Sequence, residues 1–324
     1  MTKEKKEYSP SDSPAVDVVV PPGLDGERLD RAAAELFPDY SRARLQAWII
    51  EGMLICNGVA AARTRVTVHV GDRLRLTIPE MAGTEARAQA ITLEVVYADD
   101  AIAIIDKPAG MIVHPGAGAP DGTMQNALLH RFPQTAAIPR AGIVHRLDKD
   151  TSGLLVVALN LKAHARLVDA MAAREIRREY EAIVNGVLTA GGTVDTPIGR
   201  DPRNRVRMAV LAQGRRAVTH YRVIERFAHH SHLRVRLETG RTHQIRVHMA
   251  HIRHPIVGDT LYGGSVQRGT LLSEALGQRL RAFPRQALHA CELALHHPED
   301  GSERVFQSPL PADIRGLLAA LRTG

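Results

Sequence analysis

Residues 142–158 read Gly-Ile-Val-His-Arg-Leu-Asp-Lys-Asp-Thr-Ser-Gly-Leu-Leu-Val-Val-Ala, and this stretch organises the interpretation of the whole chain. Residues 143–144 and 154–158 are short apolar runs, which predict buried strands. The polar segment between them holds two cations, two carboxylates and two hydroxyls. Burying such a segment costs free energy unless fixed partners replace the lost water. A polar loop held by rigid strands is also a common way to build a functional site.

The two aspartates of this loop allow a structural and a functional interpretation. An isolated Asp in a loop most often stabilises a turn through its own backbone. Residues 145–154 instead form ten adjacent positions that closely resemble the signature of the RluA-type pseudouridine synthases, a far more specific pattern than scattered glycines. In that family the Asp that follows Arg-Leu is the nucleophile, so the resemblance implies that Asp148 is the catalytic nucleophile. The resemblance to this family extends over nearly the whole chain from Leu24 onward.

Two further strings match the same family. Residues 240–246, Gly-Arg-Thr-His-Gln-Ile-Arg, match a motif whose arginines lie near the nucleophile. A buried carboxylate stays ionised only beside a cation, so we predict Arg246 as the partner of Asp148, with Arg241 as second choice. Tyr180 lies in an Arg-Glu-Tyr string and could be a core residue of a strand. Its match to the active-site tyrosine of the family implies that it stacks on uracil and moves a proton at C2′ or C5.

Histidines in the same region raise the possibility of a metal site: His243, His248, His251 and His254. Metal ligands need partners on one face and a supporting second layer of contacts. Here the histidines alternate with Arg241, Arg246 and Arg253, whose fixed charge repels a cation. The sequence also has no glycine-rich nucleotide loop. We therefore predict no metal and no cofactor.

Composition is that of an ordinary globular protein. The 324 residues are 44% hydrophobic and 24% charged, enough for a sizeable core and two or three domains. No apolar run reaches the length of a membrane span, and the N-terminal residues do not resemble a secretory signal. Cys56 and Cys291 are too few for a disulfide framework. We expect a cytoplasmic protein.

Positive charge is concentrated in one part of the chain. The net charge is +7, but residues 200–253 alone hold 13 Arg, no Lys and three acids. Such an excess is the electrostatic signature of a polyanion partner, although a solvated cationic surface without a ligand is the alternative. Arg203 and Arg205 lie in a cationic loop of this region that suits contact with an RNA backbone.

The order of the segments predicts two folded domains. Residues 1–15 are expected to be a disordered tail, 16–79 a small domain, 80–90 a linker rich in Ala, Glu and Gly, and 91–324 a large domain. The small domain has two helical segments and the hairpin signal Asn57-Gly58. It resembles an S4 RNA-binding module, which implies phosphate contacts from its second helix: Ser41, Arg42, Arg44 and Gln46.

The large domain is predicted to be α+β, with a mixed and largely antiparallel sheet and peripheral helices. Its strands occur in clusters, at 93–97 and 102–105, 177–184, and 219–224 and 233–237, without regular alternation of strand and helix. Helices are expected at 126–130 and 163–173.

The resemblance implies isomerisation of uridine to pseudouridine in RNA. Three routes are compatible with this role: Asp148 attacks C1′, attacks the base, or assists through a glycal. Arg146 is expected to fill the space of the flipped nucleotide or to hold its phosphate. Within the family the chain most resembles members that act on large-subunit ribosomal RNA, which implies 23S rRNA or a precursor particle as partner and helix 69 as target. We expect a monomer.

Two other classes of function compete with this interpretation. A non-catalytic RNA-binding factor for ribosome assembly would explain the S4-like module and the excess of Arg, but not the carboxylate loop. A metal-dependent hydrolase would explain the histidines and predicts inhibition by chelators. We rank the isomerase first, the binding factor second and the hydrolase third.

Overall fold

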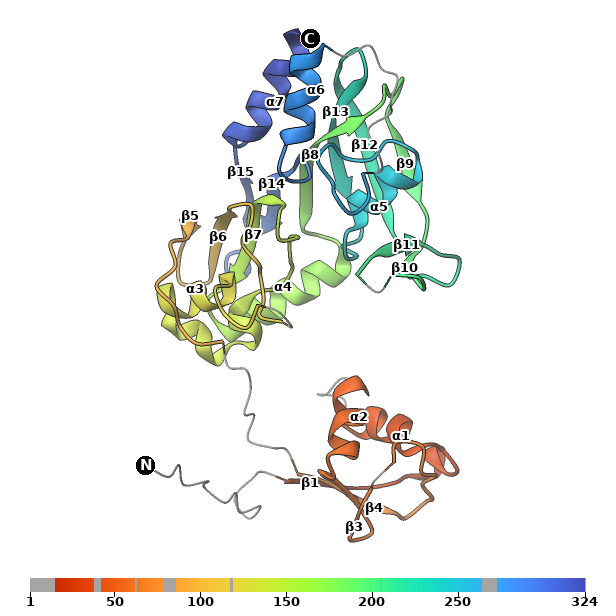
Figure 1. Ribbon diagram of the computed structural model, residues 1–324. Helices are drawn as coiled ribbons and strands as arrows, with labels where there is room; N and C mark the ends of the chain where they lie inside the picture. Colours follow the sequence, from red (N-terminus) through yellow and green to blue (C-terminus); the bar gives the residue numbers. More distant parts are fainter. Residues whose placement is uncertain are drawn as a thin grey trace, which may run out of the picture. The chain divides into compact units, whose positions relative to one another are not determined.

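The computed structural model describes residues 15–37, 42–61, 63–77, 86–116, 119–204, 206–263 and 273–323. The chain divides into two compact units, Met1–Glu85 and Ala86–Gly324, which are described separately (Figure 1). Most of the predicted tail and half of the predicted linker lie outside the described residues. Residues 86–90, which we assigned to the linker, belong to the second unit, where the side chain of Gln89 accepts the N–H of Gly122 at 2.7 Å.

Unit 1 places two helices on a four-stranded antiparallel sheet of order β1-β4-β2-β3. Its elements are β1 Ala15–Val19, a 3₁₀ turn Pro22–Leu24, α1 Leu29–Leu36, α2 Arg42–Ile50, β2 Leu54–Cys56, β3 Val59–Ala60 and β4 Arg73–Thr77. Asn57 and Gly58 both have positive φ, 50° and 81°, as a two-residue hairpin turn between β2 and β3 requires. The predicted hairpin is confirmed.

Unit 2 is built on a nine-stranded mixed sheet. The order is β5-β6-β7-β14-β8-β13-β12-β9, with β15 paired to β14, and only β7 and β14 are parallel. This confirms the predicted α+β class and largely antiparallel sheet. The strands are β5 Glu94–Ala98, β6 Ile102–Lys107, β7 Ser152–Ala158, β8 Arg177–Asn185, β9 Gly192–Asp195, β12 Val218–Arg226, β13 His230–Leu237, β14 Leu288–His296 and β15 Glu303–Gln307. A separate hairpin joins β10 Ile198–Arg200 and β11 Met208–Val210.

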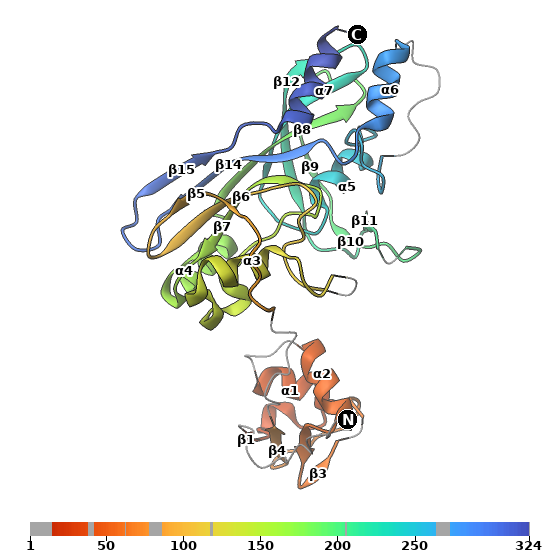
Figure 2. The same ribbon diagram turned by 60° about the vertical axis from the view of Figure 1, so that its left-hand side comes forward.

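Helices cover both faces of the sheet, as two views show (Figures 1 and 2). They are α3 Met124–Arg131, α4 Leu161–Ala173, α5 Gln244–His251, α6 Glu274–Ala282 and α7 Ala312–Thr323, with 3₁₀ turns at Pro133–Ala137 and Pro139–Gly142. Leu155 and Val157 of β7 pack in one core with α3, α5, α6 and α7, whereas Leu154 and Val156 pack in another with α4. Because both faces are covered, every residue of β7 is buried. No helix in the described ranges is long and apolar enough to cross a bilayer.

The predicted strand at 143–144 is wrong. Ile143 makes a single bridge to Val157, and the residues before it form a 3₁₀ turn in which Arg140 and Ala141 have positive φ. Gly142 lies so close to β7 that a Cβ there would be 1.9 Å from the carbonyl oxygen of Ala158. Two residues after Ile143, the imidazole Nε2 of His145 accepts the N–H of Val156 at 3.2 Å. The His145 side chain therefore takes the place of a backbone carbonyl as the partner of β7.

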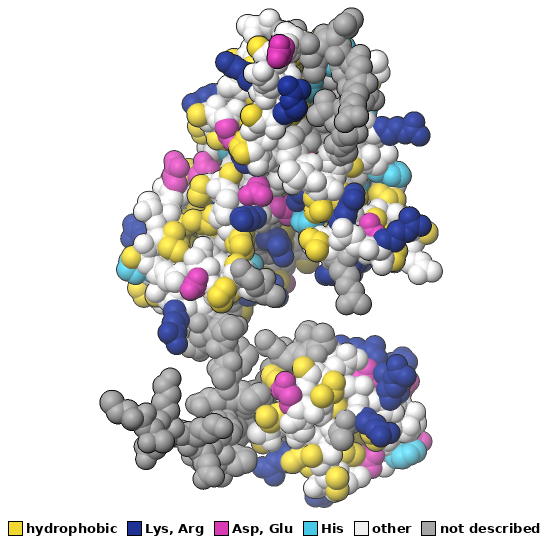
Figure 3. All heavy atoms as spheres, viewed as in Figure 1, with side chains coloured by type: hydrophobic (Ala, Val, Ile, Leu, Met, Phe, Trp, Pro, Cys, Tyr) yellow, Lys and Arg dark blue, Asp and Glu magenta, His cyan; other side chains and the backbone are white. Residues whose placement is uncertain are grey.

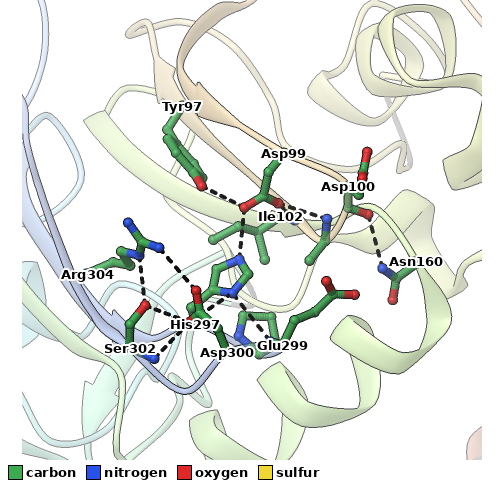
Figure 4. A network of polar contacts seen from close by, with 12 residues as sticks. Tyr97, Asp99, Asp100, Ile102, Asn160, His297, Glu299, Asp300, Ser302 and Arg304 are labelled. Carbon is green, nitrogen blue, oxygen red and sulfur yellow. Dashed lines mark hydrogen bonds and ion pairs between the residues drawn. The ribbon is translucent and has the colours of Figure 1, made fainter.

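A polar network joins the β5–β6 turn to the residues that follow β7 and β14 (Figure 4). Asp99, in the β5–β6 turn, accepts hydrogen bonds from Tyr97 and from two backbone N–H groups of its own turn. Its Oδ2 also lies 2.9 Å from Nε2 of His297, which follows β14. Asn160 caps α4 and donates to the carbonyl of Asp100. The network joins two hairpins and a helix that are distant in sequence.

We predict that Gly153→Ala strongly destabilises unit 2. Gly153 has φ 112°, and its added Cβ would lie 2.2 Å from the carbonyl oxygen of Ala290 in β14. Backbone strain and overlap together should lower the free energy of unfolding by at least about 3 kcal/mol, measured by urea denaturation. Gly301→Ala is the control, because Gly301 has φ 70° with open space around it. It should cost only about 1–2 kcal/mol, and equal losses would contradict the close-contact argument.

Candidate active site

Asp148 opens a tight turn directly before β7. The N–H of Thr151 donates to the carbonyl of Asp148 at 3.1 Å. The carbonyl of Lys149, in the middle of the turn, accepts the N–H of Gly110 and the ammonium of Lys107, both at 2.9 Å. The segment after β6 therefore fixes the backbone that carries Asp148.

Lys107 is completely buried at the end of β6. Its Nζ donates to three backbone carbonyls, those of Pro108, Met111 and Lys149, at 2.8–3.0 Å. Burial lowers its pKa to about 8, against the opposing effect of the Asp150 carboxylate. All three ammonium donors are used, so the side chain has a structural role in holding the loop.

A second buried cation holds the other side of the turn. Arg285 donates from Nη1 to the carbonyl of Asp150 at 3.1 Å. Its Nε and Nη2 form a bidentate pair with Asp313 of α7, at 2.7 and 3.0 Å. The neighbouring Gln286 donates to the hydroxyl of Thr151 at 3.1 Å. The C-terminal helix thus takes part in positioning the Asp148 turn.

Arg246 of α5 lies between two carboxylates. Its Nη1 donates to Oδ2 of Asp148 at 3.1 Å, while Nε and Nη2 form a bidentate pair with Asp259 at 2.7 and 2.9 Å. Burial alone would lower the pKa of Arg246, but the two carboxylates raise it. Asp259 is itself fully buried at its side chain and accepts the N–H groups of Leu261 and Tyr262. The guanidinium is therefore fixed from behind and directed at Asp148.

The other oxygen of Asp148 has a different environment. Oδ1 accepts no hydrogen bond from the described residues, and Nε2 of His243 lies 3.9 Å from it. His243 precedes α5 with φ 56°, and its Nδ1 lies 2.8 Å from the hydroxyl of Tyr262. Burial lowers the pKa of His243, and the Asp148 charge opposes this shift. One carboxylate oxygen is thus bound while the other is available.

Asp148 borders a cleft of about 500 Å³. Tyr180 of β8 lines the cleft and is 4% exposed, and burial raises the pKa of its phenol. The predicted strand around Tyr180 is confirmed, with Tyr180 opposite Val235 of β13. Arginines dominate the charged part of the lining: Arg140, Arg146, Arg174, Arg178, Arg241 and Arg246. The cleft has the charge and the depth to hold a nucleotide with its phosphate.

The remaining residues that we singled out occupy distinct places. Arg146 lines the cleft with an exposed side chain. Arg241 also lines it, but its Nε donates to the carbonyl of Arg216 at 3.2 Å and not to Asp148. Arg203 is exposed in the β10–β11 loop, and Arg205 lies outside the described residues.

In unit 1 two of the predicted phosphate ligands, Arg42 and Gln46, contact a buried carboxylate. Asp30 accepts hydrogen bonds from Arg28, Arg42 and Gln46, the last two at 2.8 and 2.7 Å. Burial would raise the pKa of Asp30, but these hydrogen bonds lower it to about 2. The side chain of Arg42 remains 52% exposed. Ser41 and the side chain of Arg44 lie outside the described residues. In Figure 3 Lys and Arg side chains stand out along one edge of the unit.

The histidines of the α5 region have separate partners. His248 bonds to Thr219 and Thr196, and His254 to the carbonyl of Asn185. Within the described ranges there is no group of three or more His, Cys, Asp or Glu residues that could hold a metal ion.

Sequence analysis assigned no role to several residues that build the site: Lys107, His243, Asp259, Tyr262, Arg285 and Asp313. Asp259 and Tyr262 lie in residues 254–263, His-Pro-Ile-Val-Gly-Asp-Thr-Leu-Tyr-Gly, a string that also resembles the family, so a signal was present for these two. Arg285 contacts the loop from far along the chain and is itself held by Asp313, and no local pattern indicates such contacts.

The comparisons with known proteins agree with this fold. The family model described as RNA pseudouridylate synthase matches residues 101–251, a range that includes Asp148, Tyr180 and Arg246. Two solved human structures, RNA Pseudouridylate Synthase Domain Containing 4 and Domain Containing 1, are 25% and 26% identical with TM-scores of 0.56 and 0.53. They cover 71% and 73% of this chain, and 93% and 97% of their own. The fold of unit 2 is therefore that of the pseudouridine synthases.

Curated relatives extend the match over nearly the whole chain. It is 56% identical over 303 residues to the ribosomal large subunit pseudouridine synthase D of Pseudomonas aeruginosa, covering 94% of each chain. It is 52% identical over 297 residues to the protein of that name from Escherichia coli K12, covering 92% of this chain and 91% of the other. The chain belongs to the RluA-type RNA pseudouridylate synthase family. The expectation of a pseudouridine synthase is confirmed.

We predict that Lys107→Met destabilises unit 2 by at least about 3 kcal/mol, because three backbone carbonyls lose the hydrogen bonds from its buried ammonium. Urea denaturation measures the free energy of unfolding. Lys149→Met is the matched control, since Lys149 lies in the same loop with an exposed side chain. The control should change stability by no more than about 0.5 kcal/mol. Similar losses in both variants would show that the buried contacts are not the cause.

We predict that Arg246→Lys lowers turnover about 100-fold, because an ammonium cannot bind Asp259 in bidentate geometry and still hold Asp148. Dissociation constants for RNA should stay within about 3-fold, since the total charge is unchanged. Single-turnover rates and filter binding measure the two quantities. Arg241→Lys is the comparison, and a larger loss of rate there would assign the pairing role to Arg241.

Proposed function

We propose that this enzyme converts uridine to pseudouridine in large-subunit ribosomal RNA, with Asp148 as nucleophile and no cofactor. The observation that carries the proposal is the Asp148 carboxylate at the cleft, with Oδ2 bound to Arg246 and Oδ1 free of hydrogen bonds from the described residues. The names of relatives that match more than nine-tenths of the chain refer to the large ribosomal subunit, and this supports large-subunit ribosomal RNA as the substrate.

The reaction breaks the N1–C1′ bond, turns the uracil and joins C5 to C1′, with loss of the C5 hydrogen. It is an isomerisation without a redox step. An ionised carboxylate can act on this substrate as a nucleophile or by stabilising the electron-poor sugar. Arg246 supplies a cation 3.1 Å from Oδ2 of Asp148, the kind of partner that a carboxylate needs in a partly buried site. The free oxygen is then the one that reaches the nucleotide.

Tyr180 is assigned to the uracil. Its ring lines the cleft beside Leu288 and Asp148, where a flipped base would stack on it. Because burial raises its pKa, the phenol keeps its proton near neutral pH. A protonated phenol can donate to the base or relay a proton at C2′ or C5.

The target uridine must leave its helix to reach Asp148. Arg146 is two residues from Asp148, exposed and at the cleft, so we assign it to the space left by the nucleotide or to its phosphate. Arg203 and Arg205 are assigned to the RNA backbone beside the cleft. Arg241 is assigned to substrate phosphate rather than to Asp148, because its Nε is turned toward a carbonyl.

Unit 1 is assigned to RNA binding as an S4 module. Arg42 is half-exposed although one side of its guanidinium holds Asp30, so it can contact a phosphate with its remaining N–H groups. Gln46 has its amide committed to Asp30 and would act by fixing Arg42. Ser41 and Arg44 complete the proposed set. We further propose that the enzyme is a cytoplasmic monomer, that helix 69 of 23S rRNA is the target, and that free or particle-bound RNA is the partner.

The decisive measurement is tritium release from RNA that carries 5-tritiated uridine. Wild type should release tritium from a transcript that contains helix 69, because forming the C5–C1′ bond removes the C5 hydrogen. Asp148→Asn should reduce the rate at least about 1000-fold, as expected for loss of a nucleophile. The matched control is Asp150→Asn, which removes a carboxylate from the same loop and should retain release within about 3-fold.

Different outcomes separate the alternatives. Normal RNA binding without tritium release by wild type, in transcripts and in precursor particles, would favour the RNA-binding assembly factor. Release from unrelated RNA but not from helix 69 would retain the reaction and reject the target. Full activity of Asp148→Asn would reject the nucleophile.

A further inference from the structure

The hydroxyl of Tyr262 links a surface hairpin to the active-site histidine. It lies 2.8 Å from the backbone nitrogen of Met208, at the start of β11, and 2.8 Å from Nδ1 of His243. The Met208 N–H can only donate, so the phenol oxygen accepts this bond. The Tyr262 ring is also fixed by two guanidinium groups, those of Arg246 and Arg207, at 5.0 and 5.3 Å from its centroid.

These partners determine the tautomer of His243. A buried phenol proton needs an acceptor, and among the described residues only Nδ1 of His243 is available to take it. Nδ1 must then be unprotonated, which leaves the proton of a neutral imidazole on Nε2. Burial favours the neutral form of both groups, since it lowers the pKa of His243 and raises that of Tyr262.

The Nε2–H of this tautomer faces the unbound oxygen of Asp148. The separation of Nε2 and Oδ1 is 3.9 Å, longer than a hydrogen bond but within reach of a small rotation of either side chain. Such contacts are often long in a free enzyme and shorten when substrate fills the site. Arg246 already holds Oδ2 of Asp148. A hydrogen bond to Oδ1 would therefore fix the second oxygen and prevent the carboxylate from rotating.

We propose that His243 is a positioning residue that orients Oδ1 of Asp148 through its Nε2–H, and that Tyr262 sets the required tautomer. The inference rests on the proposed role of Asp148 as nucleophile. The contact with Met208 then has a function as well. Its N–H donates to the Tyr262 oxygen, so the phenol proton is left to point at Nδ1 of His243.

The test compares His243→Gln with His243→Leu. Both replacements have the same backbone strain at φ 56°, and only Gln keeps an N–H group near the position of Nε2. His243→Leu should lower the single-turnover rate of tritium release about 10-fold to 100-fold at saturating RNA. His243→Gln should be about 10-fold faster than His243→Leu. The dissociation constants for RNA should agree with wild type within about 2-fold in both variants.

A double-mutant cycle tests the role of Tyr262. Tyr262→Phe keeps the ring and removes the proton that Nδ1 accepts, so it should lower the rate about 5-fold in the wild-type background. In the His243→Leu background the same change should have less than about a 2-fold effect, because Tyr262 acts through His243. Equal effects in both backgrounds would overturn the coupling, since a purely structural role predicts additivity.

The other outcomes are equally informative. Equal rates for His243→Gln and His243→Leu, whether both normal or both impaired, would overturn the inference, as would a loss explained by weaker RNA binding. Asp148→Asn is measured beside them to separate the two proposals. If Asp148→Asn is inactive while His243→Leu is normal, only the role of His243 fails. If Asp148→Asn is active, the proposed nucleophile itself fails.

Discussion

The active site depends on cations buried beneath a single turn. Lys107, Arg246 and Arg285 come from the end of β6, from α5 and from the segment before β14, and each contacts the turn of residues 148–151. A buried cation is costly unless carboxylates or carbonyls surround it. The turn supplies part of that surrounding, and the cations in return fix the turn. Neither would keep this geometry alone, so the loop and its supports form one structural unit.

The two carboxylates bound by Arg246 have unequal roles. Asp259 is fully buried and uses both oxygens on the guanidinium and on backbone N–H groups. Asp148 gives Arg246 only one oxygen and reaches the cleft with the other. Asp259 contributes more than Asp148 to raising the pKa of Arg246, which is what a buried guanidinium requires. The unequal sharing of one guanidinium thus separates a structural carboxylate from the one that we propose to be the nucleophile.

The sequence predicted the elements whose signals are local. Alternation and length identified the paired strands β12 and β13, the Asn57-Gly58 turn was correct, and the motifs directed attention to Asp148, Tyr180 and Arg246. The strand at 143–144 failed because Arg140 and Ala141 adopt left-handed conformations that no apolar pattern reveals. The supports Lys107 and Arg285 also could not be assigned, since each reaches the turn through a carbonyl far away in the chain, that of Lys149 or of Asp150. Turns, strands and motifs formed by neighbouring residues can be predicted from a sequence, whereas hydrogen bonds between residues that are distant in the chain cannot.

The position of β14 has a consequence for how the enzyme is made. This strand spans residues 288–296 of 324, yet it lies between β7 and β8 in the middle of the sheet. The Asp313 carboxylate that holds Arg285 comes still later, in the last helix. During synthesis the turn of residues 148–151 therefore leaves the ribosome long before its neighbours in the sheet exist. The nascent chain cannot complete this sheet or the contacts of the turn until residues 285–313 have also been made, and such non-local pairing slows folding.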